Sequence, residues 1–388
     1  MTKNTKLNVK VVTALTLVHF TGDFYSSFTS PLLPVYVDKL ALSMTQVGLL
    51  TGMIRLLAFV VQPCVGYLAD RYQTRSFILW GVFLSVVCIP FSGIAPNFYV
   101  LLAVLAAGSA GSSMFHPSVT GMLPLYAGNR KGLCMSIFNT GGTFSFAVGP
   151  VFISWYVGRF GLENMPWTMV MGLLGIIYFL KVIPMPVSEG MQNYGFIGSL
   201  KESLGAVWKP IALIWVVMVL RAIAGQSFIT FMPVHLAQTG YDLISVGFIV
   251  SLFILAGTFS GLISGSLSDS MGFKRIFFMA HLLMTPALLL YLFAPGDFVY
   301  AGAFVGGFFA LSTMPLGVLM AQNLAPKGRS MVSSLMMGLA YGLGGLASPI
   351  VGKLADIYSI KTVLFWVAFI PLITLIPIAK FPRLGKEA

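Results

Sequence analysis

Two short loops of similar sequence, one in each half of the chain, decide how this protein is organised. Residues 66–75 read GYLADRYQTR, and residues 265–275 read GSLSDSMGFKR. Each stretch begins with glycine, carries an aspartate four residues later and ends in arginine, and the offset between the two glycines is 265 − 66 = 199. The same offset relates three further pairs of residues: Pro34 and Pro233, Arg130 and Arg329, and Pro150 and Pro349. A fixed interval of this kind predicts two similar halves.

The composition is that of a chain that crosses a membrane many times. Of the 388 residues, 57% are hydrophobic and 9% are charged, whereas an ordinary soluble domain carries about 25% charged residues. A soluble fold of this length could not hide so much apolar surface from water. Long unbroken apolar runs also exclude an outer-membrane barrel, because barrel strands alternate over about 10 residues. A spanning helix needs about 20 apolar residues, and we identify twelve such runs: residues 10–36, 45–69, 77–95, 98–123, 133–158, 166–187, 209–236, 243–267, 276–295, 298–323, 331–356 and 361–380.

The basic residues between these runs and at their ends are divided unevenly between alternate connections. Of the 23 Lys and Arg residues, seventeen fall in one set of connections and four in the other, namely Lys39, Arg159, Lys353 and Lys361. Cytoplasmic loops of membrane proteins carry the excess of positive charge, so we expect both chain termini in the cytoplasm. The formal net charge of +12 therefore reflects orientation in the membrane, and we expect no nucleic-acid partner.

The sequence thus predicts an all-α polytopic membrane protein with 12 transmembrane helices in two pseudo-symmetric six-helix bundles. The longest polar stretch, residues 188–208, lies between the sixth and seventh apolar runs. We therefore expect an N-terminal bundle over residues 1–187, a cytoplasmic linker over 188–208 and a C-terminal bundle over 209–388. In transporters built from two such repeats, the substrate site lies near the middle of the bilayer between the halves.

The duplicated loop resembles the signature loop of the major facilitator superfamily. The resemblance implies the superfamily fold, and it implies that the loop aspartates act as latches on the cytoplasmic side. Asp70 would face the start of the eleventh helix near Arg329, and Asp269 the start of the fifth helix near Arg130, because helix N-termini favour negative charge. The predicted gating residues are Asp70, Arg71, Arg75, Arg130, Asp269 and Arg329.

A narrower resemblance, to the fosmidomycin-resistance-type efflux proteins, rests on the fourth and fifth apolar runs and covers most of the chain. Residues 108–117 read GSAGSSMFHP, residues 136–142 read SIFNTGG, and Gly149 and Pro150 follow. His19 and Asp23 in the first run, His116, and residues 331–345 in the eleventh run add to it. The resemblance implies efflux and a functional role for His19, Asp23 and His116. The resemblance to the superfamily implies a monomer, and we expect it in a bacterial-type inner (plasma) membrane.

Few ionisable residues lie in the middle of the predicted spans, where they are costly and usually functional. Asp23 is the one acid in such a position, and His19 lies one turn earlier on the same face of the helix. We expect Asp23, with His19 and His116, to carry a coupling proton. Arg55 and Arg221 lie in the middle of the second and seventh runs, and guanidinium groups suit phosphonate or carboxylate. The predicted substrate-binding residues are Arg55, Gln62, Ser113, Asn139 and Arg221. In the alternative interpretation, Asp23 pairs with Arg55 or Arg221 and only holds helices together.

These features predict a proton-coupled secondary active transporter of a small organic anion, which exports its substrate by alternating access with Asp23 as the proton site. Two alternatives remain open: a proton-driven uptake symporter of an organic anion, and a divalent-metal transporter in which His19, Asp23 and His116 form a nitrogen and oxygen site. The sequence has no zinc-protease helix, nucleophile elbow or ATP-binding loop, so we expect no enzymatic activity and no cofactor. The expected partners are the anion, protons and the lipid bilayer.

Overall fold

The computed structural model describes residues 6–69, 74–185, 205–325, 336, 338 and 340–382. Within these ranges the chain forms helices, turns and connecting segments and contains no β-strand, which confirms the predicted all-α class. Nine helical stretches of the described ranges are long and apolar enough to cross a membrane, judged by length and composition. They are Met44–Gln62, Arg75–Ile94, Phe98–Tyr126, Leu162–Val182, Trp208–Gln238, Leu243–Ser268, Phe273–Phe293, Phe298–Leu324 and Ile360–Ala379.

The helices gather into two compact units. The first comprises the described parts of Met1–Ala41 and Leu57–Gln192, and the second those of Leu42–Leu56 and Asn193–Ala388. Helix α3 (Met44–Ala69) therefore contributes its first half to the second unit and its second half to the first unit.

The predicted linker, residues 188–208, falls largely outside the described residues, because residues 186–204 are not among them. Its last residues form the short 3-10 helix η3 (Gly205–Val207) and the start of α9.

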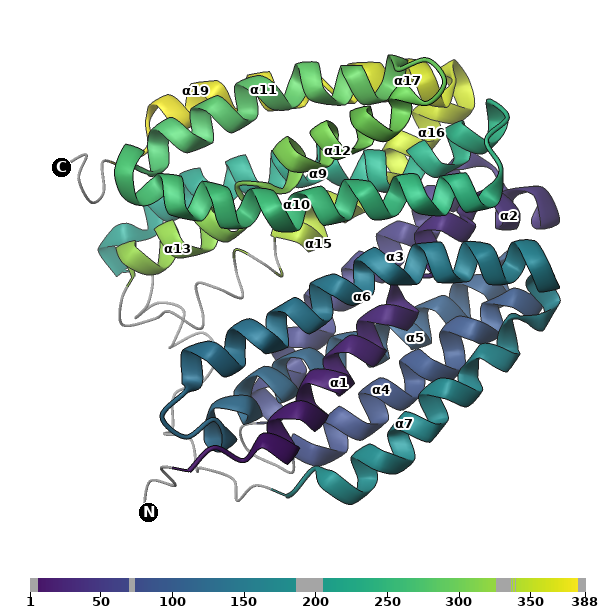
Figure 1. Cartoon of the computed structure of the whole chain (residues 1–388). Helices are drawn as coiled ribbons and strands as arrows, with labels where there is room; N and C mark the ends of the chain where they lie inside the picture. Colours follow the sequence, from purple (N-terminus) through teal and green to yellow (C-terminus); the bar gives the residue numbers. More distant parts are fainter. Residues whose placement is uncertain are drawn as a thin grey trace. The chain divides into compact units, whose positions relative to one another are not determined.

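In the first unit, helix α1 lies at the centre of the packing. The helices of this unit are α1 (Val9–Ser26), α2 (Thr29–Leu40), α4 (Thr74–Phe91), α5 (Phe98–Tyr126), α6 (Lys131–Phe160) and α7 (Met169–Val182), with the 3-10 helices η1 (Ser92–Ile94) and η2 (Leu162–Thr168). Helix α1 contacts α4, α5, α6 and α7, and α4 lies against α5 (Figure 1). Side chains on α1 are therefore enclosed by neighbouring helices on several sides.

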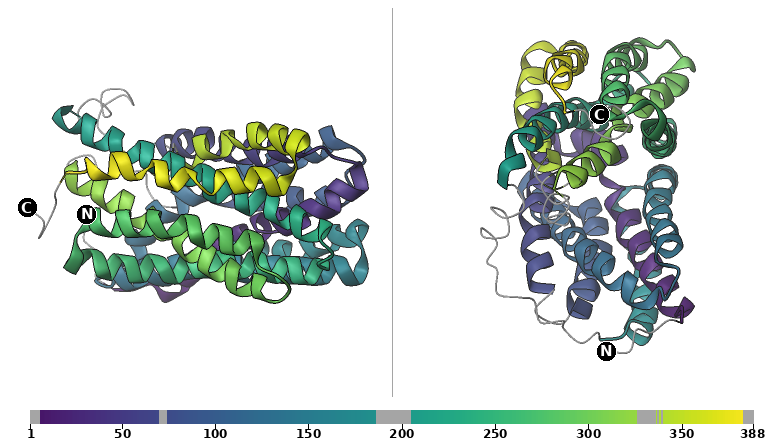
Figure 2. Two further views of the ribbon diagram at one scale, coloured as in Figure 1. Left: turned by 90° about the horizontal axis from the view of Figure 1, so that it is seen from above. Right: turned by 90° about the vertical axis from the view of Figure 1, so that its left-hand side faces the viewer.

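In the second unit, helix α9 has the corresponding central place. The helices are α9 (Trp208–Gln238), α10 (Leu243–Met271), α11 (Phe273–Phe293), α12 (Phe298–Leu311), α13 (Met314–Leu324), α15 (Ala340–Leu346), α16 (Ser348–Tyr358), α17 (Ile360–Val367), α18 (Ile370–Ile373) and α19 (Leu375–Ala379). The C-terminal helices α17 to α19 run alongside the teal α9 (Figure 2).

The interval of 199 residues found in the sequence recurs in the helix boundaries. Helices α1 and α9 begin at Val9 and Trp208, where 208 − 9 = 199. Helices α3 and α10 begin at residues 44 and 243, and α4 and α11 begin at residues 74 and 273, again 199 apart. Three pairs of helices therefore begin at equivalent positions of the sequence repeat.

Some spans that the sequence predicts as continuous are interrupted. The run 298–323 forms α12 and α13, with Pro315 in the first turn of α13. The run 361–380 forms α17, α18 and α19, and Pro371 lies in the first turn of α18. Proline has no backbone N–H to donate. It is therefore tolerated in the first turn of a helix, but it cannot continue the backbone hydrogen bonds of a helix that precedes it.

The first half of α3 is fixed to α16 within the second unit. The Asp356 carboxylate of α16 accepts hydrogen bonds from the backbone N–H groups of Met44 (2.6 Å) and Thr45 (2.9 Å), at the N-terminus of α3. A carboxylate at a helix N-terminus satisfies donors that have no partner inside the helix. At Gly48, an added Cβ would lie 2.3 Å from the backbone oxygen of Ser348, so the two helix backbones approach as closely as glycine permits.

Candidate functional site

The first helix places His19 and Asp23 on one face. Helix α1 starts at Val9, where the Asn8 side chain accepts a hydrogen bond from the backbone N–H of Val11 (3.2 Å). This cap satisfies one of the free donors of the first turn. From there the helix continues without a break through residues 19 and 23, which are four residues apart and therefore neighbours on its surface.

Helix α5 brings His116 to the same place. Its neighbour Phe115 is buried against Gly22 of α1, where an added Cβ would lie 2.1 Å from the Phe115 ring. Only a glycine at position 22 leaves room for that ring. The contact therefore fixes the position of α5 along the axis of α1. His116 follows Phe115 in the chain and lies beside Asp23 as a result.

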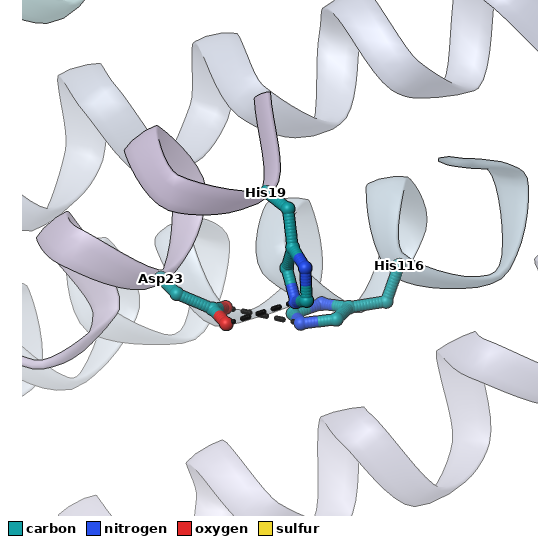
Figure 3. A group of neighbouring side chains, drawn as sticks. All are labelled: His19, Asp23 and His116. Atoms are coloured by element: carbon teal, nitrogen blue, oxygen red, sulfur yellow. Dashed lines mark ion pairs between the residues drawn. The ribbon is translucent and has the colours of Figure 1, made fainter. Parts of the chain in front are cut away.

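The three side chains meet at the Asp23 carboxylate. His19 Nε2 lies 3.1 Å from Oδ2, and His116 Nε2 lies 3.0 Å from Oδ1. Figure 3 shows both rings beside the carboxylate oxygens, with a dashed line from each ring to the carboxylate. The exposed fraction of the side chain is 5% for Asp23, 11% for His19 and 29% for His116. Within the first unit, the described partners of the Asp23 carboxylate are therefore two histidines.

The other ring nitrogen of each histidine is held by the main chain. His19 Nδ1 lies 3.0 Å from the backbone oxygen of Phe138 on α6, and His116 Nδ1 lies 2.7 Å from that of Ser112, one turn earlier on α5. A carbonyl oxygen can only accept a hydrogen bond, so each Nδ1 carries the hydrogen. The rings are thus fixed with Nε2 toward the carboxylate.

Helix α6 places two residues against the cluster that were not among the predicted site residues. The Phe138 ring stacks on the His19 ring with 4.1 Å between centroids. An added Cβ on Gly142 would lie 2.5 Å from His19 Nε2 and 3.0 Å from Asp23 Oδ2. The pair Gly141-Gly142 is visible in the sequence as a helix-packing signal, but the signal alone does not say which helix approaches there.

The remaining predicted substrate residues of the first unit do not touch this cluster in a described contact. The Ser113 hydroxyl is buried and donates to the backbone oxygen of Ser109 (2.9 Å). Asn139 is exposed on α6, and Gln62 is half-buried on α3. Their roles in binding substrate stay predictions.

The two predicted arginines belong to the second unit. Arg55 is half-buried in the first half of α3, with its aliphatic stem against Gly345. Arg221 is 1% exposed on α9 and donates from Nη1 to the backbone oxygen of Ala310 (2.6 Å). Arg221 therefore has a structural contact with α12 in addition to any role toward substrate, which stays a prediction.

The predicted gating contacts fall mainly outside the described residues. Asp70, Arg71 and Arg329 are not among the described residues, and the Asp269 side chain is not described, although its backbone lies in the last turn of α10. Arg130 is exposed at the N-terminus of α6. Arg75, in the first turn of α4, donates from Nη2 to the backbone oxygen of Leu180 on α7. The latch pairs therefore stay predictions.

The donor atoms of His19, Asp23 and His116 all lie within 4.8 Å of one another. Among the described residues they are the one group of three ionisable side chains with the spacing for a shared metal ion. Two imidazoles and a carboxylate at this spacing have the chemistry to bind either protons or a divalent ion.

Three comparisons relate the chain to known proteins. A family model for the Major Facilitator Superfamily matches residues 15–349. The chain is 26% identical to the fosmidomycin resistance protein of Escherichia coli (strain K12), over 97% of this chain and 94% of that protein. It is 30% identical to the quinolone resistance protein NorA of Staphylococcus aureus (strain Mu50 / ATCC 700699) over 161 residues, 39% of each.

The fold is also similar to that of solved transporters. A bacterial homologue of the human lysosomal transporter Spinster superposes with a TM-score of 0.80 at 16% identity, over 97% of this chain and 98% of that chain. The resemblance to the superfamily and to the fosmidomycin-resistance-type proteins is thereby confirmed. This multi-pass membrane protein belongs to the major facilitator superfamily, whose members are transporters and not enzymes.

Proposed function

We propose that this protein is a proton-coupled secondary transporter that exports a small organic anion by alternating access, with Asp23 as the proton site. The observation that carries the proposal is the pair of histidine contacts on the buried Asp23 carboxylate, at 3.0 and 3.1 Å. We further propose that both termini lie in the cytoplasm of a bacterial-type inner membrane and that the protein acts as a monomer. Residues 1–187 and 209–388 would form the two moving halves, joined by residues 188–208.

The two histidine partners of Asp23 support the proposal that it exchanges protons. An arginine keeps its charge at every physiological pH, so an acid paired with arginine would hold helices together without cycling. Histidine has an ordinary pKa of about 6.5 and changes its charge in the physiological range. A carboxylate flanked by two imidazoles can therefore gain and lose protons in the physiological range, which a carboxylate paired with arginine would not do.

The direction and the substrate class rest on relatives and on the arginines. The fosmidomycin resistance protein and the quinolone resistance protein NorA are named for resistance, which export of a toxic compound would provide. Arg55 and Arg221 would bind the anionic group, with Gln62, Ser113 and Asn139 contributing polar contacts. The pairs Asp70 with Arg329 and Asp269 with Arg130 would close the cytoplasmic side.

A transport screen in proteoliposomes tests this function. The purified full-length protein is reconstituted, a pH gradient is imposed, and uptake is measured for fosmidomycin, other phosphonates and small carboxylates, with Mn²⁺ and Zn²⁺ as further probes. We expect an anion to accumulate on the acidic side, and a protonophore to abolish accumulation. Accumulation on the alkaline side would support an uptake symporter, and flux of the metal ions alone would support the metal transporter.

The arginines should determine the preference for anions. We expect Arg55→Gln and Arg221→Gln to weaken transport of anionic substrates about 10-fold or more, because a hydrogen bond to a charged group contributes about 1.5–3 kcal/mol. Transport of neutral substrates should change little. Arg159→Gln, which removes an exposed cation at the end of α6, is the matched control, and Arg221→Lys preserves a buried donor if the glutamine variant is unstable. An equal loss for neutral substrates would contradict the assignment.

A further inference from the structure

We propose that the cluster of His19, Asp23 and His116 binds two protons, one in each contact between the carboxylate and a histidine Nε2. The inference rests on the proposed role of Asp23 as a proton site, and it adds the number of protons and the atoms that hold them. It follows from the directions of four contacts: two between ring nitrogens and backbone carbonyls, and two between ring nitrogens and the carboxylate.

The backbone fixes the first hydrogen on each ring. Because the oxygens of Phe138 and Ser112 can only accept, Nδ1 of His19 and Nδ1 of His116 are both donors. In a neutral imidazole with its hydrogen on Nδ1, Nε2 presents a lone pair. Both Nε2 atoms of this site therefore need a further hydrogen before they can donate to Asp23.

The chemistry of the carboxylate also requires a hydrogen in each of the two contacts. An ionised carboxylate only accepts, so a neutral ring would direct its Nε2 lone pair at an oxygen lone pair only 3.0–3.1 Å away. Each contact becomes attractive when it holds one hydrogen, whether that hydrogen is bonded to nitrogen or to oxygen. Two contacts therefore require two protons beyond those on Nδ1.

The described residues around Asp23 provide no other hydrogen-bond donor in place of these protons. Asp23 Oδ1 is buried and has no aligned hydrogen-bond donor among the described residues, and a buried acceptor without a donor is costly. The ionisable groups that act on Asp23 from the packed helices are His116 of α5 and His19 of its own helix. The α6 residues against the cluster, Phe138 and Gly142, carry no ionisable group.

Proton number sets the charge of the site. With two protons the cluster carries a net charge of +1, with one proton it is neutral, and with none it carries −1. His116, with 29% of its side chain exposed against 11% for His19, is the ring through which the protons exchange first. The loaded site thus offers a positive charge in an apolar bundle, and it loses that charge when the first proton leaves.

Nitrogen NMR on the full-length protein in lipid nanodiscs tests the inference. The chain has four histidines, so ¹⁵N-labelled imidazoles give few signals, and His235→Gln serves both for assignment and as the control outside the cluster. We expect both rings to keep a hydrogen on Nδ1 at every pH, and the cluster to release two protons as the pH rises. In Asp23→Asn the amide N–H donates to one Nε2, so the count should fall from two protons to one.

The outcomes separate this inference from the proposed function. A bare Nδ1 on either ring, a single proton in the wild type, or an unchanged count in Asp23→Asn would overturn it. If Asp23→Asn does not fold, the hydrogens on the wild-type rings still decide the question. Transport that does not depend on the pH gradient would refute the proposed function. The inferred number of protons would not be affected by that result.

Discussion

Asp23→Asn is expected to abolish the accumulation of substrate driven by a pH gradient. Asparagine has almost the same shape as aspartate but cannot ionise, so the variant keeps the packing of α1 and loses the exchangeable negative charge. Exchange of labelled for unlabelled substrate across the membrane should persist, because it needs the alternating movement without net proton transfer. Both activities are measured in the same proteoliposomes, with and without an imposed gradient.

The control for this variant is a second acid outside the cluster. Asp242 is exposed and caps α10 by accepting hydrogen bonds from the backbone N–H groups of Ile244 and Ser245, and asparagine serves equally well at that position. Asp242→Asn should therefore transport like the wild type. Full proton-driven accumulation in Asp23→Asn would remove Asp23 from the mechanism.

Gly142→Ala is expected to reduce proton-driven transport at least about 10-fold, although it changes no ionisable group. The added Cβ would lie 2.4 Å from His19 Cε1 and 2.5 Å from Nε2, distances that real Cβ contacts do not reach. The ring must therefore move off Asp23 or α6 must move off α1, and losing one contact to a buried charge costs about 1.5–3 kcal/mol. Initial rates under a fixed pH gradient measure the effect.

Two glycine variants separate this effect from a general loss of helix packing. An added Cβ on Gly121, in α5, meets no atom within 4 Å, and one on Gly141 meets the methyl group of Thr16 at 2.9 Å. Gly121→Ala should leave transport unchanged, and Gly141→Ala should have a smaller effect than Gly142→Ala. Equal rates in all three variants would show that the position of His19 does not matter for coupling.

The sequence alone was sufficient for the class of protein and the symmetry of its chain. Apolar runs long enough to span a bilayer lead to an all-helical membrane protein, because backbone groups in lipid must bond within their own helix. The interval of 199 residues, read from two loops, reappears in the starts of α1 and α9. The sequence also singled out His19, Asp23 and His116, because charge in the middle of a span is rare and therefore conspicuous.

The positions at which helices are interrupted were harder to predict from the sequence. A hydropathy run does not reveal where a proline, such as Pro315, ends one helix and begins the next, since apolar residues continue on both sides of the break. The partner of Arg221 was equally hidden, because the backbone oxygen of Ala310 has no signature in the sequence.

The tertiary structure alone determines how the three side chains of the cluster are arranged. His19 and Asp23 are neighbours on one helix, and that spacing could be read directly, but His116 reaches them only because α5 packs its Phe115 against Gly22. The direction of each ring is set by a backbone carbonyl, of Phe138 or of Ser112. Every residue has such a carbonyl, so only the packing of the helices determines which one meets a ring, and with it which ring nitrogen faces the carboxylate.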